Sequence, residues 1–127
     1  MFDLNNIEKK QNIKFPEEYK QLYQSNFRAF NDKMEIDTKE GIYRIYKFLS
    51  AAEINDILEE LYDLLGYDII PIAEIDYGDY ICLYYRGEAR DPVIIYWNYE
   101  LALENAEEGI TYLYSSIHEF ITNTTRL

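Results

Sequence analysis

The sequence predicts an α+β fold: a mostly antiparallel sheet with a central meander, flanked by helices. Its strands are predicted by three runs rich in β-branched and aromatic residues, at Ile70–Tyr77, Tyr80–Arg86 and Val93–Tyr99. Short connections containing Gly, Asp or Pro separate these runs, which is typical of hairpins. A capping box opens at Ser50, and apolar residues at helical spacing follow it, so a helix is predicted over Ser50–Leu65.

Two further helices are predicted before the meander. The first is Leu4–Gln11, with Asp3 as its N-cap. The second is Pro16–Ser25, because proline suits the first helical position and two glutamates follow it in the first turn. The segment Asn26–Glu40 has no clear period and is expected to be an irregular loop.

The segments around the C-terminal half of the sheet are less regular. Gly41–Phe48 alternates and is predicted to be one strand, although its faces are not cleanly sorted. Glu100–Glu108 is acidic and is expected to be a helical turn or a loop. Ile110–Tyr114 fits either an edge strand or an entry to the last helix, which a second capping box at Ser116 predicts.

Length and composition favour a single domain over residues 1–127 with a substantial core, since 48% of the residues are hydrophobic. No apolar run approaches the roughly 18 residues that a membrane span needs. The N-terminal segment lacks the basic and apolar regions of a secretory signal. Cys82 is the single cysteine and has no partner for a disulfide, so a cytoplasmic location is expected.

Charge is distributed unevenly along the chain. The net charge is -12, and residues 48–127 hold sixteen Asp/Glu but only three Lys/Arg. Residues 1–47 hold eight Asp/Glu and nine Lys/Arg. A field of this sign repels nucleic acid and anionic membranes and attracts basic partners, so neither of the first two is an expected ligand. Solubility alone is an equally good explanation of the acidity.

Glu74 and Asp76 are expected to alternate onto a solvent-exposed face of the sheet, because antiparallel sheets can leave one face open. Asp76 and Asp79 also flank a Tyr-Gly turn, where carboxylates bond nearby backbone amides. Turn chemistry is therefore a better interpretation of these two residues than a metal site, and no metal or cofactor is predicted.

The aromatic residues of the meander are the other candidate contacts. Six tyrosines lie between Tyr77 and Tyr99, and the adjacent Tyr84 and Tyr85 must point to opposite faces of the sheet, so the six cannot all be core. Tyrosine is enriched at binding hot spots, but it is also a strong strand former. Trp97 fits packing under a helix better than surface contact, although both interpretations stay open. Cys82 is expected to be buried and inert.

Catalytic chemistry is not expected. His118 is the only histidine, and it falls at the second position of the predicted last helix. No nucleophile motif surrounds it, and the sequence contains neither a HExxH motif nor a Gly-rich phosphate loop. His118 is therefore interpreted as a surface residue, and the protein is predicted not to be an enzyme.

The order of several short motifs resembles a known superfamily. A helix opens with FPEEYK from Phe15. IPIA from Ile70 and DYGDYICL from Asp76 follow, then VIIYWNYE from Val93, and the chain closes with SIHEFI from Ser116. This order is similar to the SUKH superfamily, which includes the yeast cell-wall synthesis regulator family and many bacterial immunity proteins. The resemblance covers about Ile13 to Ile121.

Two places depart from the family pattern. Members often carry Asn-Gly-Gly after the proline-capped helix, where this chain has Asn26-Phe27-Arg28. Members commonly have Asp-His-Glu after the tryptophan, where this chain has Asn98-Tyr99-Glu100, so only Glu100 is kept. The resemblance implies an α+β fold with helices packed on a mostly antiparallel sheet, and it implies that many bacterial members neutralise a toxin, often a nuclease.

The sequence therefore yields two functional hypotheses. In the first, the protein is an immunity protein or antitoxin that binds a cognate basic toxin, such as a nuclease, through an acidic, tyrosine-rich surface. Its candidate partner-binding residues are Glu74, Asp76, Asp79, Tyr84, Trp97 and Glu100. In the alternative, it is an intracellular regulatory or scaffold protein of the same fold without a toxin partner.

Overall fold

The computed structural model describes residues 3–25, 34–76, 78–87 and 91–126. The helices within these ranges are α1 (Leu4–Gln11), α2 (Glu17–Gln24), α3 (Ala51–Glu60), α4 (Tyr62–Leu65), α5 (Tyr99–Glu104), the 3-10 helix η2 (Ala106–Gly109) and α6 (Ile117–Thr122). The strands are β1 (Met34–Thr38), β2 (Gly41–Ile45), β3 (Lys47–Phe48), β4 (Ile69–Asp76), β5 (Asp79–Tyr84), β6 (Val93–Trp97), β7 (Ile110–Tyr114) and β8 (Thr124–Arg126).

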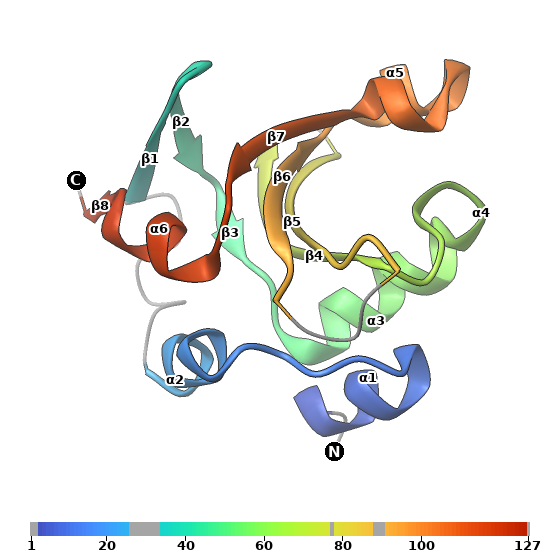
Figure 1. Cartoon of the computed structure of the whole chain (residues 1–127). Coiled ribbons are helices and arrows are strands. Elements are labelled where there is room, and N and C mark those ends of the chain that lie inside the picture. The colour runs from blue at the N-terminus through green and yellow to red at the C-terminus, as the bar shows by residue number, and fades with distance from the viewer. Residues whose placement is uncertain (1–2, 26–33, 77, 88–90, 127) are drawn as a thin grey trace.

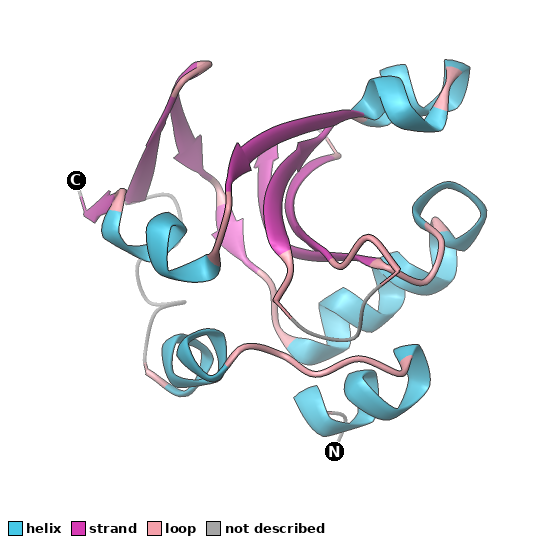
Figure 2. Ribbon diagram, in the orientation of Figure 1, coloured by secondary structure: helices cyan, strands magenta, loops and turns pink. Residues whose placement is uncertain are grey.

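The strands form two antiparallel sheets, which confirms the α+β fold (Figures 1 and 2). The larger sheet has the order β3-β4-β5-β6-β7 and the smaller one β2-β1-β8. Every described strand pair is antiparallel. Figure 1 shows the larger sheet as a strongly curved ribbon, with α1, α2 and α3 along one side and α5 at the opposite end.

The predicted meander is confirmed as β4-β5-β6. Its strands agree with the predicted runs to within two residues at each end, and Tyr77 lies outside the described residues. Gly78 has a φ of 93° in the β4–β5 turn, a conformation that glycine adopts without steric cost. The β4–β5 register shifts twice, between Pro71 and Ala73 and between Glu74 and Asp76.

Both faces of the meander are covered, so the expectation of an open, solvent-exposed sheet face is wrong at its centre. Consecutive strand residues point to opposite faces, yet Ile81, Cys82 and Leu83 are all fully buried. The first register shift also breaks the simple alternation that was expected to place Ile70 and Glu74 together, because Ile70 pairs with Leu83 in the interior.

The predicted helix Ser50–Leu65 is divided into α3 and α4 at Leu61. Ser50 is the N-cap as predicted: its hydroxyl accepts a hydrogen bond from the Glu53 amide (3.2 Å), and the Glu53 carboxylate accepts one from the Ser50 amide (2.9 Å). Ile54 and Leu58 are buried, as the helical spacing predicts. The chain leaves the helical segment at Gly66, whose φ is 71°.

The region before α3 differs most from the sequence-based expectation. Within the expected loop, 26–33 lies outside the described residues, but Met34–Thr38 is a strand that pairs with β2. The single predicted strand Gly41–Phe48 is instead two strands in different sheets. At the junction, the Tyr46 amide donates to the Glu74 carbonyl (3.0 Å), which begins the pairing with β4.

The terminal helices are close to the predictions. α1 and its Asp3 cap are confirmed. Pro16 is the N-cap of α2 rather than its first helical residue. In α6, the Ser116 hydroxyl accepts from the Glu119 amide (3.2 Å), but the Glu119 carboxylate bonds Ser115 instead of completing the box. Ile110–Tyr114 pairs with β6, which resolves that segment as a strand.

Candidate functional site

One face of the larger sheet brings together tyrosines from two strands. Residues paired directly across neighbouring antiparallel strands project from the same face. The pairing therefore places Glu74, Tyr80 and Trp97 on one face in a single cross-strand row. Tyr84 shares this face because it lies four residues beyond Tyr80 on β5. Tyr112 of β7 joins it through the pairing of β7 with β6.

Tyr84 and Tyr112 form an aromatic pair at the surface, here called the tyrosine platform. Their ring centroids are 6.2 Å apart and their planes are inclined by 35°. β6 runs between their strands, and its residues Val93 and Ile95, which pair with these tyrosines, are buried. Tyr112 is 58% exposed and Tyr84 is partly buried. The platform therefore covers part of the core on one side and is open to a partner on the other.

Burial and carboxylates raise the pKa of one tyrosine of the platform. Burial raises the pKa of the Tyr84 hydroxyl, and the neighbouring Asp68, Tyr112 and Glu107 raise it further, while Arg86 opposes them. Tyr84 is therefore neutral at physiological pH, with negative charge close to its ring. Asp68 is held near the end of β5, because its backbone carbonyl accepts a hydrogen bond from the amide of Tyr85, the residue after Tyr84 (2.8 Å).

Tyr80 is a more deeply buried tyrosine whose pKa is also raised by burial and by nearby carboxylates. Burial raises the pKa of Tyr80 to about 12, and the charges of Glu74 and Glu60 contribute to the increase. The Tyr80 ring stacks on Trp97, with centroids 6.2 Å apart. We call this surface the acidic tyrosine face. It consists of Tyr80, Tyr84 and Tyr112, together with the carboxylates that lie on it or act on its tyrosines, which are Glu60, Asp68, Glu74 and Glu107.

Two of the sequence-predicted site residues, Glu74 and Trp97, flank Tyr80 in the cross-strand row of this face. Trp97 is fully buried, so its place as a surface contact is wrong and the packing interpretation holds. Trp97 lies next to Tyr80 in the cross-strand row and stacks on its ring. Glu74 is partly buried and sits opposite Lys47 of β3, whose pKa its charge helps to raise. Glu74 is therefore already engaged with a cation of its own chain.

The carboxylate of Asp79 is hydrogen-bonded within its own chain. It accepts hydrogen bonds from the Tyr96 hydroxyl (2.9 Å), the Asn98 amide nitrogen (3.4 Å) and the Tyr99 backbone amide (3.1 Å). These bonds fix the start of α5 to the β4–β5 hairpin. Glu100 lies one residue further and is exposed. The backbone of Asp76 pairs with Asp79, and its side chain lies outside the described residues.

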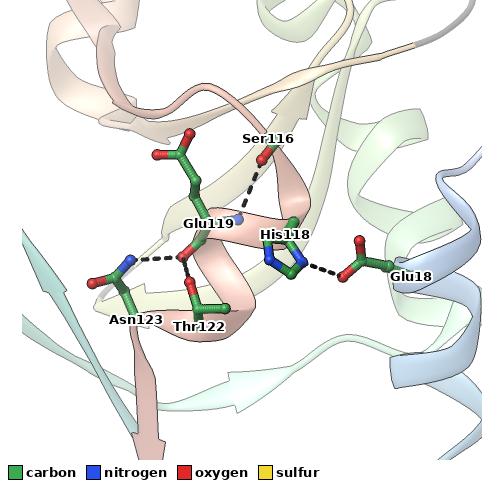
Figure 3. Close-up of polar contacts among 6 residues, drawn as sticks. All are labelled: Glu18, Ser116, His118, Glu119, Thr122 and Asn123. Atoms are coloured by element: carbon green, nitrogen blue, oxygen red, sulfur yellow. Dashed lines mark hydrogen bonds and ion pairs between the residues drawn. The ribbon is translucent and has the colours of Figure 1, made fainter.

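His118 is a surface residue, as the sequence predicts, and Figure 3 shows its setting. Its Nδ1 lies 2.9 Å from Glu18 Oε2, so the side chain links α6 to α2. Both side chains are well exposed, at 66% and 47%. The rest of the network in Figure 3, from Ser116 to Asn123, caps the two ends of α6. These contacts stabilise the junction of two helices and form no nucleophile–base pair.

The described ranges contain no group of three or more His, Cys, Asp or Glu side chains that could hold a metal ion. In the same ranges, no helix is both long enough and apolar enough to cross a membrane. Cys82 is fully buried, and burial raises the pKa of its thiol, as expected for an unreactive core cysteine. What the surface does offer is a set of tyrosines beside carboxylates, and tyrosine is enriched at protein interfaces.

Comparison with known families supports the fold and the resemblance described above. The model of the SMI1 / KNR4 family (SUKH-1) matches residues 3–123. The chain belongs to this family. A search of curated proteins finds no match. For this SUKH-1 protein the family match includes the whole of the larger sheet and ends after α6, before β8 of the smaller sheet, so the acidic tyrosine face lies within the family domain.

The contacts predicted from the sequence did not include five residues of the acidic tyrosine face, which are Glu60, Asp68, Tyr80, Glu107 and Tyr112. Tyr112 could have been predicted as a strand residue, because the run Ile110–Tyr114 could be recognised as a strand although its partner strand was unknown. The three carboxylates come from helix ends and connections far apart in the chain. Their proximity to Tyr80 and Tyr84 depends on the curvature of the sheet, which has no local signal.

Proposed function

We propose that this SUKH-1 protein is an immunity protein that binds and neutralises a basic protein toxin through its acidic tyrosine face. The observation that carries the proposal is the combination of an exposed tyrosine platform and surrounding carboxylates on one face of the family domain. Binding, rather than catalysis, is its activity, and a protein toxin, rather than nucleic acid or membrane, is its partner. A cytoplasmic location suits neutralisation of a toxin that acts inside the cell.

The physical basis is complementarity of charge and shape. A nuclease cleft is positive because it binds phosphate, so a carboxylate-rich surface can occupy it and exclude the substrate. Tyrosines then contribute buried area at low entropic cost. With a net charge of -12, the chain also accelerates encounter with a basic partner through long-range attraction.

Co-expression tests the proposal directly. Any basic protein encoded next to this chain is a candidate toxin, and the readout is growth of cells that express the candidate alone or together with the protein. We expect growth to be restored together with the protein, and a tagged chain to recover the toxin from the lysate. If neither happens with any basic neighbour, the immunity function is wrong and the regulatory or scaffold alternative takes its place.

A charge reversal locates the contact. We expect Glu107→Lys to slow association with the toxin and to leave dissociation nearly unchanged, because exposed charges mainly steer encounter. The effect should shrink as salt rises, since screening acts over about 8 Å at physiological ionic strength. Asp56→Lys is the matched control: Asp56 is also exposed and changes the net charge equally, but it lies on α3. Equal slowing by both variants would mean that only net charge matters.

A further inference from the structure

We propose that the tyrosine platform, with Asp68 and Glu107, is a recognition site for an arginine side chain of the partner. This inference rests on the proposed function, because it names the chemical group by which a basic protein would be held at the acidic tyrosine face. The site would take a guanidinium group in preference to an ammonium group. It is built from side chains of β5, β7, η2 and the α4–β4 connection, and two arguments carry it, one from ring geometry and one from charge.

The ring geometry suits a planar cation. Cations are attracted to the face of an aromatic ring when they lie within about 6 Å of its centroid. Tyr84 and Tyr112 have centroids 6.2 Å apart and an interplanar angle of 35°, so a flat group that lies across one ring also reaches the other. Tyr112 is 58% exposed, which leaves its ring accessible, and the residues that pair with the two tyrosines from β6, Val93 and Ile95, are buried.

The surrounding charge complements a guanidinium group. Asp68 and Glu107 both act electrostatically on Tyr84, and the Asp68 backbone lies beside the end of β5, where its carbonyl accepts from the Tyr85 amide (2.8 Å). Neither carboxylate has an ion-pair partner within the described part of the chain. An arginine placed on the platform can therefore stack on the rings while its N–H groups donate to one or both carboxylates.

Arginine fits this combination better than lysine. Its guanidinium group is planar, stacks on aromatic rings, presents five donors in a fixed arrangement and is weakly hydrated, whereas the lysine ammonium group is a compact, strongly hydrated point charge. Charge attraction alone would treat the two cations alike. Discrimination between them is thus the specific signature of the platform.

Two probe peptides test this inference without the toxin. The dissociation constants of hexa-arginine and hexa-lysine are measured by isothermal titration at one ionic strength. We expect hexa-arginine to bind at least about fivefold more tightly than hexa-lysine to the natural chain. Tyr112→Leu keeps an apolar side chain on β7 but removes the ring, and it should reduce the preference to less than about twofold. Tyr112→Phe should keep it.

The control is Tyr46→Leu, because Tyr46 is 54% exposed and lies at the junction of β2 and β3. This variant should leave the arginine preference unchanged. Equal binding of the two peptides to the natural chain would overturn the inference, and so would a preference that survives Tyr112→Leu. Neither result touches the immunity function, which co-expression decides separately, so a failure of one is distinguishable from a failure of the other.

Discussion

Asp79 is predicted to stabilise the fold rather than to contact a partner, and Asp79→Ala tests this. The carboxylate holds three groups at once, namely the Tyr96 hydroxyl, the Asn98 side chain and the Tyr99 amide, at 2.9, 3.4 and 3.1 Å. Removing it leaves the first turn of α5 without its tie to the β4–β5 hairpin. The substitution should therefore lower the free energy of unfolding and loosen the corner that carries α5.

The expected size follows from the environment of the carboxylate. A hydrogen bond to a charged group contributes about 1.5–3 kcal/mol when its loss leaves a partner unsatisfied. Asp79 is only partly buried and its longest bond is weak, so water can replace part of what is lost. We therefore expect Asp79→Ala to cost about 2–3 kcal/mol, well below three full contributions.

Urea unfolding measures this cost. Trp97 is the only tryptophan and is fully buried, so its fluorescence reports the unfolding of the sheet. Glu100→Ala is the matched control: Glu100 is an exposed carboxylate on the same corner, and its loss should stay within about 0.5 kcal/mol. A cost below about 0.5 kcal/mol for Asp79→Ala would refute the assignment and return Asp79 to the list of partner contacts.

Two further predictions concern the core and the pH dependence of stability. Leu58→Ala should cost about 2–5 kcal/mol in urea unfolding, whereas Leu61→Ala should cost less, because Leu58 is 5% exposed and Leu61 is only partly buried at the α3–α4 break; equal costs would contradict this burial assignment. Partial burial raises the pKa of Glu53, but its bonds to Lys47 and Ser50 outweigh this effect and leave the pKa below its usual value, while the bond to Glu53 raises the pKa of Lys47. The ion pair should thus contribute less than about 1 kcal/mol to the free energy of unfolding between about pH 5 and 10, and this contribution should be lost as the pH falls below about 4 or rises above about 10.5. Lys47→Met should remove this pH dependence from the unfolding curves, and an unchanged pH profile in that variant would contradict the role of the pair.

The sequence carried enough information for elements whose signals are local. The α1 cap at Asp3, the capping box at Ser50 and the meander strands are each specified by a few adjacent residues, and each is confirmed. β1 was missed because Met34–Thr38 is short and polar, and it becomes a strand only by pairing with β2 and β8. The division of Gly41–Phe48 between two sheets likewise depends on where β4 lies.

The candidate site was predictable in its chemistry but only partly in its residues. Acidic and tyrosine-rich composition predicted a recognition surface, and Tyr84 belongs to the acidic tyrosine face that we propose for it. The register shift between Pro71 and Ala73 altered which residues share a face. Trp97 entered the core, and Asp79 was taken up by hydrogen bonds, because these outcomes are decided by packing across strands rather than by sequence spacing.

The affinity of the toxin for a matched pair of tyrosine variants tests the central claim most directly. Tyr112→Ala removes half of the tyrosine platform, and Tyr46→Ala removes a tyrosine of similar exposure, 54% against 58%, outside the acidic tyrosine face. We predict that Tyr112→Ala weakens binding by about 2 kcal/mol or more, mainly through faster dissociation, and that Tyr46→Ala changes it by less than about 0.5 kcal/mol. Loss of binding on Tyr46→Ala with full affinity on Tyr112→Ala would place the contact on another surface and contradict the account.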